Sequence, residues 1–202
     1  MLSRVRLSRD VRHEGHAMAG KENKNHAGAL HPLDVFYAVG KPLPQHTTID
    51  GSLVPEPYRS LLVHTGDMTP ALEGFHNKTI HLQVLQSRQE DDDYVREVVL
   101  LLDGSNKPVE FGAIKINLAL FNAGARADIL TGRRPLGSIM RVQKVQHTSR
   151  PSAYICVQPD DVVISALQLS KAEQSTKLYG RHNTLLTPSG EALADIVEIL
   201  PP

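Results

Sequence analysis

The sequence predicts an α+β fold in which a single, mainly antiparallel β-sheet has helices packed on one side. Runs of alternating or β-branched residues at 80–84, 95–102 and 109–118 are typical of strands. The turn sequences at 103–106 and 188–190 join neighbouring apolar runs. Hairpins of this kind make a sheet antiparallel, and helical segments between strand runs then cover a face of it.

The size and composition indicate one globular domain. A chain of 202 residues fits a single domain with a tail. It carries 22 basic and 22 acidic residues, so its formal net charge is zero, and 41% of its residues are hydrophobic. A neutral chain has no global field to attract nucleic acid or an anionic membrane. An anionic ligand therefore needs a local site.

Cysteine usage and hydropathy indicate a cytoplasmic protein without a membrane partner. The single cysteine, Cys156, excludes an internal disulfide framework and a cysteine-based zinc site. The longest uninterrupted aliphatic run covers only residues 98–102. A membrane-spanning helix needs about 20 apolar residues.

The first 30 residues are predicted to be a disordered tail, and residues 31–202 the folded domain. The segment is rich in basic residues and almost lacks bulky apolar ones, so it has little with which to form a core. Met18-Ala19-Gly20 would also make an ordinary translation start.

The elements of the domain follow from local patterns. Residues 55–64 and 70–76 are predicted to be short helices, the second with Thr69 as N-cap and Pro70 at its first position. The three strand runs come next, and residues 122–140 are predicted to be helix and loop. Three further strands are predicted at 153–157, 178–186 and 191–200.

No common catalytic motif is present, and neither a cofactor nor a metal is predicted. The sequence lacks a dinucleotide-binding glycine motif, a P-loop, a nucleophile elbow and a zinc-protease motif. Its histidines are scattered without metal-ligand spacing. The acidic run at 90–93 is typical of a solvated loop.

Two charged residues share strand faces with apolar residues. Glu198 has the parity of Ile196 and Leu200, and Arg96 has the parity of Val98. Burying either charge without a partner would cost several kcal/mol. The two could pair with each other, or one could reach water from an edge strand. Alternatively, both face a polar ligand in a mostly apolar cavity.

Five motifs from residue 55 to the C-terminus together resemble the chorismate lyase (chorismate pyruvate-lyase) family. They occur in the family's order and at compatible spacing. They are Tyr58-Arg59-Ser60-Leu61-Leu62 with Gly66-Asp67-Met68-Thr69, Val95-Arg96-Glu97-Val98 followed by Asp103-Gly104, Arg134-Pro135-Leu136-Gly137, Leu178-Tyr179-Gly180-Arg181 with Ser189-Gly190, and Val197-Glu198-Ile199-Leu200-Pro201.

The resemblance implies the cofactor-independent conversion of chorismate to 4-hydroxybenzoate and pyruvate, an activity that would supply ubiquinone biosynthesis. By position, Arg96 matches the arginine that holds the substrate carboxylate, and Glu198 matches the active-site glutamate. Met68 and Leu136 match apolar and backbone contacts to the ligand. We expect a monomer whose only partner is this small-molecule substrate.

The sequence departs from the family at one position. Better-known members have a second arginine after a glycine in the third strand, where this chain has Ala113 after Gly112. Lys115 would share a strand face with Ala113 and could replace the missing cation. Arg181 and Arg134 are the other candidates.

Two other functions stay open. The ligand-sensing UTRA domain of some bacterial transcription regulators shares the lyase fold and binds an effector without turnover. Such regulators carry an N-terminal winged helix, and residues 1–54 are too few and too poorly patterned for one. Ala113 also leaves open an enzyme of the same fold that acts on a related chorismate-derived acid.

Overall fold

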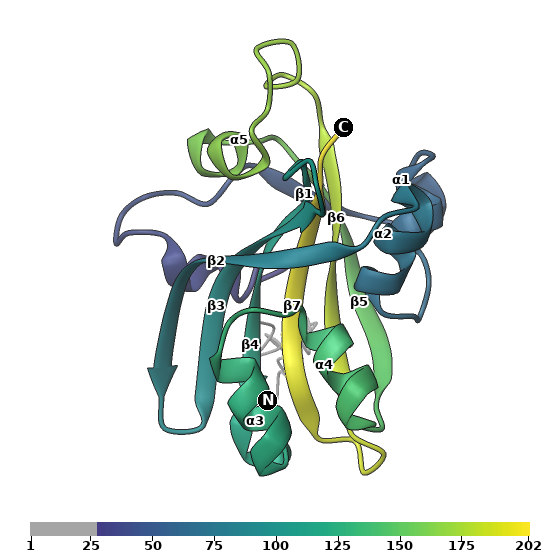
Figure 1. Cartoon of the computed structure of the whole chain (residues 1–202). Coiled ribbons are helices and arrows are strands. Elements are labelled where there is room, and N and C mark those ends of the chain that lie inside the picture. Colours follow the sequence, from purple (N-terminus) through teal and green to yellow (C-terminus); the bar gives the residue numbers. More distant parts are fainter. Residues whose placement is uncertain (1–27) are drawn as a thin grey trace, which may run out of the picture.

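The computed structural model describes residues 28–202, which form one seven-stranded antiparallel sheet flanked by helices (Figure 1). The strand order is β1-β5-β6-β7-β4-β3-β2, and every neighbouring pair is antiparallel. The predicted fold class is therefore confirmed. The predicted disordered tail lies outside the described residues except at its end, where Leu30 is buried in the core.

The structure gives the following bounds. The strands are β1 (His46–Ile49), β2 (Ile80–Glu90), β3 (Asp93–Leu102), β4 (Pro108–Asn117), β5 (Thr148–Val157), β6 (Leu178–Leu186) and β7 (Ala192–Leu200). The α-helices are α1 (Tyr58–Leu62), α2 (Met68–His76), α3 (Ala123–Leu130), α4 (Leu136–Gln143) and α5 (Asp161–Leu167). Short 3-10 helices are η1 (Leu33–Phe36), η2 (Gly51–Leu53) and η3 (Leu118–Leu120).

Some boundaries differ from the sequence prediction. Helix α2 begins at Met68, with Asp67 rather than Thr69 as its N-cap. Pro70 remains in the first turn, where no intrahelical partner exists for a backbone N–H. Strand β2 continues past residue 84, where the predicted run ends, to Glu90. A bulge between Val84 and Gln86 shifts its register with β3 and interrupts the alternation at that point.

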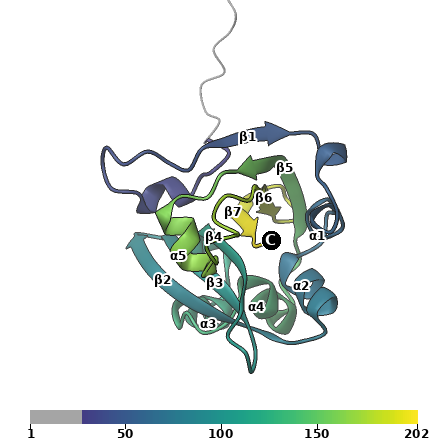
Figure 2. The ribbon, with the colours of Figure 1, turned by 90° about the horizontal axis from the view of Figure 1, so that it is seen from above.

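The alternation of β3 divides the core between the two faces of the sheet. Val98 and Leu100 pack in the cluster that contains residues of α1 and α2, whereas Val99 and Leu101 pack with residues of η1 and α5. Figure 2 shows α1 to α4 on one side of the curved sheet and α5 on the other. Within residues 28–202, no helix is long and apolar enough to cross a membrane.

Two glycines bring neighbouring strands close to β7. A Cβ at Gly112 of β4 would overlap the carbonyl oxygen of Val197, and a Cβ at Gly180 of β6 would overlap that of Glu198. Gly112 pairs in register with Glu198, and Gly180 with Ile199. The backbone around Glu198 is therefore held from both sides at a distance that only glycine permits.

Candidate functional site

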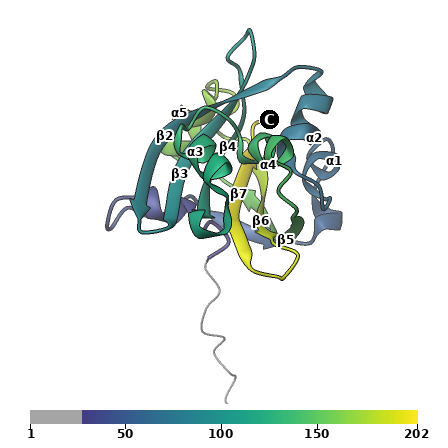
Figure 3. The same ribbon diagram turned by 60° about the horizontal axis from the view of Figure 1, so that its bottom comes forward.

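A cavity of about 60 Å³ lies between the sheet and the helices that cover it. This is several times the space that one water molecule needs. Figure 3 shows α4, which contributes to the cavity wall, lying across the sheet. The lining residues are Asp67, Met68, Thr69, Leu82, Arg96, Val98, Leu100, Glu110, Ile114, Pro135, Leu136, Gly137, Met140, Asn183, Leu185, Ile196 and Glu198.

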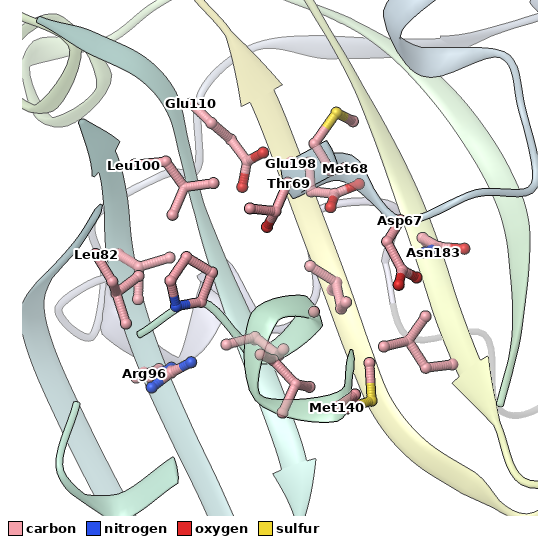
Figure 4. A pocket seen from close by; sticks show the side chains of 17 residues that line it. Asp67, Met68, Thr69, Leu82, Arg96, Leu100, Glu110, Met140, Asn183 and Glu198 are labelled. Carbon is pink, nitrogen blue, oxygen red and sulfur yellow. The ribbon is translucent and has the colours of Figure 1, made fainter. Parts of the chain in front are cut away.

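Strand alternation places both singled-out charges at this cavity. Arg96 lines it together with Val98 and Leu100 of β3, and Glu198 lines it together with Ile196 of β7. Figure 4 shows Arg96 at a distance from Glu198. The parity prediction for both residues therefore agrees with the structure, although they do not pair with each other.

Arg96 is a buried cation without an anionic partner among residues 28–202. Its residue is 1% exposed, and the guanidinium donates only long hydrogen bonds, 3.4 Å to the Ile129 carbonyl and 3.5 Å to the Arg134 carbonyl. Its Nε has no partner in the described part of the chain. Burial lowers the pKa of Arg96 to about 10, although the charge interaction and hydrogen bond with Tyr94 act to raise it. The guanidinium therefore has unused capacity to bind an anion.

Glu198 forms its ion pair with Arg181 of the adjacent strand β6. The Arg181 Nε donates to the Glu198 Oε2 at 2.5 Å, and the two residues are opposite each other in the β6–β7 register. Arg181 is fully buried and also donates to three backbone carbonyls, of Leu62, His64 and Gly66. Its donors are occupied by the protein, so Arg181 positions Glu198 and the segment before α2. It is not a lining residue.

Glu110 is a functional candidate that the sequence analysis missed. It lines the cavity from β4, is 5% exposed, and its Oε2 has no hydrogen-bond partner within residues 28–202. Burial and the nearby Glu198 charge raise its pKa well above the ordinary value, although Arg181 partly opposes them. Figure 4 shows Glu110 and Glu198 together. The parity of Glu110 with Ile114 in the predicted strand could have identified it.

Met68 and Leu136 both line the cavity, each as the first residue of a helix. Helix α2 begins at Met68 and α4 begins at Leu136, so the unpaired N–H groups of both first turns lie beside the cavity. The two helix starts are neighbours, because a Cβ at Gly137 would make ordinary van der Waals contact, at 3.7 Å, with the Asp67 Cβ and the Thr69 Oγ1.

The structure places Lys115, the first candidate for a replacement cation, away from the cavity that Arg96 and Glu198 line. Strand β4 presents Glu110 and Ile114 to the cavity, so Ala113 and Lys115 face the other side. The Lys115 Nζ pairs with the Asp93 carboxylate at 2.7 Å, and Ala113 is buried in the opposite core. The Arg134 side chain reaches Asp128 at 3.4 Å, so only its backbone carbonyl approaches Arg96.

An ion pair between Asp67 and His147 lies at one end of the cavity. Asp67 lines the cavity, and its carboxylate accepts from the His147 Nε2 at 3.0 Å. Burial would lower the pKa of His147. The hydrogen bond to Asp67, that to the Val145 carbonyl and the Asp67 charge together raise it above its ordinary value. This pair ties the start of α2 to the residue before β5.

Within residues 28–202, no three histidine, cysteine, aspartate or glutamate side chains are grouped as metal ligands would be. The polar side chains at the cavity are instead one guanidinium and three carboxyl groups, with the hydroxyl of Thr69 and the amide of Asn183. Such groups bind and orient an organic acid and exchange protons with it.

No family model matches the sequence, and no curated protein matches it. Solved structures with a similar fold include PhnF from Mycobacterium smegmatis, 13% identical, with 69% of this chain and 65% of that chain covered and a TM-score of 0.49. The effector domain of the same protein is 13% identical, with coverages of 67% and 88% and a TM-score of 0.49. A GntR-family transcriptional regulator from Bacillus cereus is 12% identical, with coverages of 61% and 92% and a TM-score of 0.42.

Proposed function

We propose that the cavity binds a small cyclic carboxylic acid through Arg96. The observation that supports this most strongly is the guanidinium itself, which is buried at the cavity without an anionic partner among residues 28–202. A ligand carboxylate would provide the missing charge, and its two oxygens match the fork of a guanidinium.

The ligand would be a flat ring with polar groups at both ends. Leu82, Val98 and Leu100 give the cavity an apolar wall. Glu110 and Glu198 lie together away from Arg96, where they could hydrogen-bond a ring hydroxyl (Figure 4). Chorismate and 4-hydroxybenzoate both carry a carboxylate and a hydroxyl at opposite positions of one ring.

The lyase reaction suggested by the family resemblance needs only groups that bind the substrate and transfer protons. In chorismate, the bond between a ring carbon and the enolpyruvyl oxygen breaks, and the adjacent carbon that bears the hydroxyl loses its proton. The electron pair of that C–H bond becomes part of the aromatic ring. The departing enolpyruvate takes up a proton and becomes pyruvate, so atoms and charge balance.

We assign the two proton transfers to the two carboxyl groups. Arg181 holds the Glu198 carboxylate in place beside the cavity, so Glu198 is positioned to accept the ring proton. Burial and the nearby Glu198 charge raise the pKa of Glu110, which favours its protonated form, so Glu110 is suited to donate a proton to the leaving oxygen. Two carboxyl groups with different environments commonly divide acid and base roles in this way.

The second candidate function is ligand sensing without turnover. The Arg181 Nε donates to the Glu198 Oε2 at 2.5 Å, so this carboxylate oxygen is already engaged by the protein. One similar solved structure is described as an effector domain. The same cavity would then bind an aromatic or cyclic acid as a signal, and an enzyme for a related chorismate-derived acid remains a third possibility.

Turnover of chorismate distinguishes these functions. The full chain is incubated with chorismate in a buffer that contains a chelator, and 4-hydroxybenzoate and pyruvate are quantified together. Equal amounts of both products support the lyase. If neither forms while chorismate raises the melting temperature, the result supports the sensing function or an enzyme for a related acid, and excludes the lyase. If no product forms and neither chorismate nor 4-hydroxybenzoate raises the melting temperature, the proposed ligand class is contradicted.

The matched variant is Glu198→Gln, which keeps an oxygen acceptor for Arg181. We expect this variant to fold and to bind 4-hydroxybenzoate but to lose turnover by about 100-fold or more. Turnover close to that of the wild type would contradict the assignment of Glu198 as proton acceptor.

A further inference from the structure

A second, larger cavity lies on the opposite face of the sheet, between strands β2 and β3 and helix α5. Its volume is about 470 Å³. Figure 2 shows α5 beside β2 and β3, on the side away from α3 and α4. The lining residues are Gln83, Leu85, Gln86, Glu97, Val99, Leu101, Asp161, Val162, Ser165, Ala166 and Gln168.

Glu97 is the buried polar group of this second cavity. The residue is 2% exposed, and its Oε2 accepts a hydrogen bond of 3.1 Å from the Gln86 Nε2. Its Oε1 has no partner, and no lysine or arginine within residues 28–202 forms an ion pair with it. A buried carboxylate oxygen without a donor costs free energy that a ligand donor would recover.

The bulge in β2 builds the polar wall next to Glu97. Val84 pairs with Val98 and Gln86 pairs with Glu97, so Leu85 is the extra residue in β2. Without the bulge, strand alternation would turn Gln86 to the other face of the sheet. The bulge therefore brings the Gln86 amide to Glu97, on the face where Gln83 and Leu85 also lie.

Helix α5 is fixed in place and adds a second acidic group. Its N-cap Asp160 accepts hydrogen bonds from the backbone N–H groups of Val162 and Val163. The other oxygen of Asp160 accepts from the Tyr37 hydroxyl at 2.9 Å. Asp161 lines the cavity, and none of the lining residues is basic. The charge of the lining is therefore negative.

We propose that this cavity binds a small organic cation, an alkylammonium ion whose ammonium group donates to the Glu97 Oε1. An ammonium has three N–H donors and complements an acidic site that lacks any cation of its own. Its hydrocarbon part would contact Leu85, Val162 and Ala166. This inference goes beyond the proposed function and does not depend on it, because the two cavities lie on opposite faces of the sheet.

Calorimetric titration of the full chain with n-butylammonium chloride tests the proposal, with potassium chloride as the ionic control and 1-butanol as the uncharged analogue. We expect saturable binding of butylammonium and no binding of the alcohol. The Glu97→Gln variant keeps an acceptor for Gln86 and removes the charge, so affinity for butylammonium should fall at least 10-fold. Glu90→Gln, at an exposed acid outside the cavity, should bind as the wild type does.

A second variant keeps the test decisive if Glu97→Gln fails to fold. Ser165 is an exposed residue of α5 that lines the cavity. Ser165→Leu therefore puts a larger apolar side chain into the cavity and leaves Glu97 unchanged, and it should also weaken butylammonium binding. Failure of butylammonium to bind the wild type, or equal affinity in the wild type and the folded variants, would overturn the proposal. Neither outcome would alter the test with chorismate.

Discussion

Of the four buried charged groups at or beside the first cavity, two are paired with each other and two have no partner of opposite charge among residues 28–202. Arg181 and Glu198 satisfy each other, whereas Arg96 has no anion and Glu110 has no cation of its own among the described residues. Folding stability alone would not favour a lone buried guanidinium, because replacing it with an apolar side chain of similar volume is often neutral or stabilising. The unpaired groups are therefore better explained by binding than by stability.

Removal of Arg181 is predicted to destabilise the fold. Arg181→Met would leave Glu198 and Glu110 as buried carboxyl groups without a cation, and it would also free the carbonyls that Arg181 holds before α2. We expect a loss of about 3–5 kcal/mol in the free energy of unfolding. Chemical denaturation of the variant measures this loss.

The double variant Arg181→Met with Glu198→Leu is the control for that prediction. It removes both charges, so part of the lost stability should return. A single variant as stable as the wild type would show that the ion pair does not position the segment before α2.

Glu110 is predicted to make stability depend on pH. Its folded pKa is raised, so the folded state holds a proton that the unfolded state releases above about pH 4.3. Stability should therefore fall as pH rises from that value toward the raised pKa. Glu110→Gln removes this dependence, so the melting temperatures of wild type and variant should diverge between pH 5 and pH 8. Parallel curves would contradict a buried, protonated Glu110.

Single residues were predictable where strand parity decides their placement. Parity placed Arg96 and Glu198 at one cavity, and the same rule applied to residues 109–118 would have included Glu110 and excluded Lys115. The pairing of Glu198 with Arg181 depends on the β6–β7 register. A bulge between Leu185 and Leu186 shifts that register, so counting outward from the predicted turn would not have placed Arg181 opposite Glu198.

At the scale of elements, Gly112 is predicted to be indispensable for the approach of β4 to β7. In Gly112→Ala the new Cβ would overlap the Val197 carbonyl oxygen, which belongs to the backbone and has little freedom to move. We expect destabilisation of at least about 1–3 kcal/mol. Thermal unfolding should show a fall of several degrees, since about 1 kcal/mol changes the melting temperature by roughly 2–4 °C at this size.

Gly74→Ala is the matched control. Gly74 lies inside α2, and a Cβ there meets no atom within 4 Å. Alanine is the better helix former, so this variant should gain about 0.5–1 kcal/mol. Equal effects of the two substitutions would contradict the close approach at Gly112.

The Asp67–His147 pair is predicted to stabilise the start of α2 more at low pH. The folded pKa of His147 is raised, so its contribution is fully present below the unfolded value of about 6.5 and is lost as pH rises through the folded pKa. His147→Gln should therefore cost about 1 kcal/mol near pH 6 and less near pH 8. A cost that grows with pH, measured by denaturant titration, would contradict this sign.

Elements bounded by clear turn residues were predicted closely, whereas β2 and β5 were predicted only in part and β1 and α5 were missed. The bounds of β6 match the prediction, and those of β3 and β4 differ by one or two residues, because their apolar runs are bounded by turn residues. Strand β1 has only four residues and is mostly exposed, so it carries no pattern of burial. Helix α5 spans seven residues, for which the only local signal is the Asp160 N-cap.

For the whole molecule, one strand supplies both proposed ligand sites. Arg96 and Glu97 are adjacent in β3, and strand alternation sends them to opposite faces of the sheet. The face covered by α1 to α4 thus carries a cationic anchor, and the face covered by α5 carries an anionic one. A chain with zero formal net charge can therefore hold two ligands of opposite charge.

Calorimetric titration with 4-hydroxybenzoate tests whether Arg96 anchors a ring carboxylate. The wild type is compared with Arg96→Met, in which an apolar side chain fills the position of the buried cation. We predict saturable binding to the wild type and a loss of at least about 10-fold in affinity for the variant, whose melting temperature should be unchanged or higher. Equal affinity of both proteins for 4-hydroxybenzoate would show that Arg96 does not bind the ligand carboxylate.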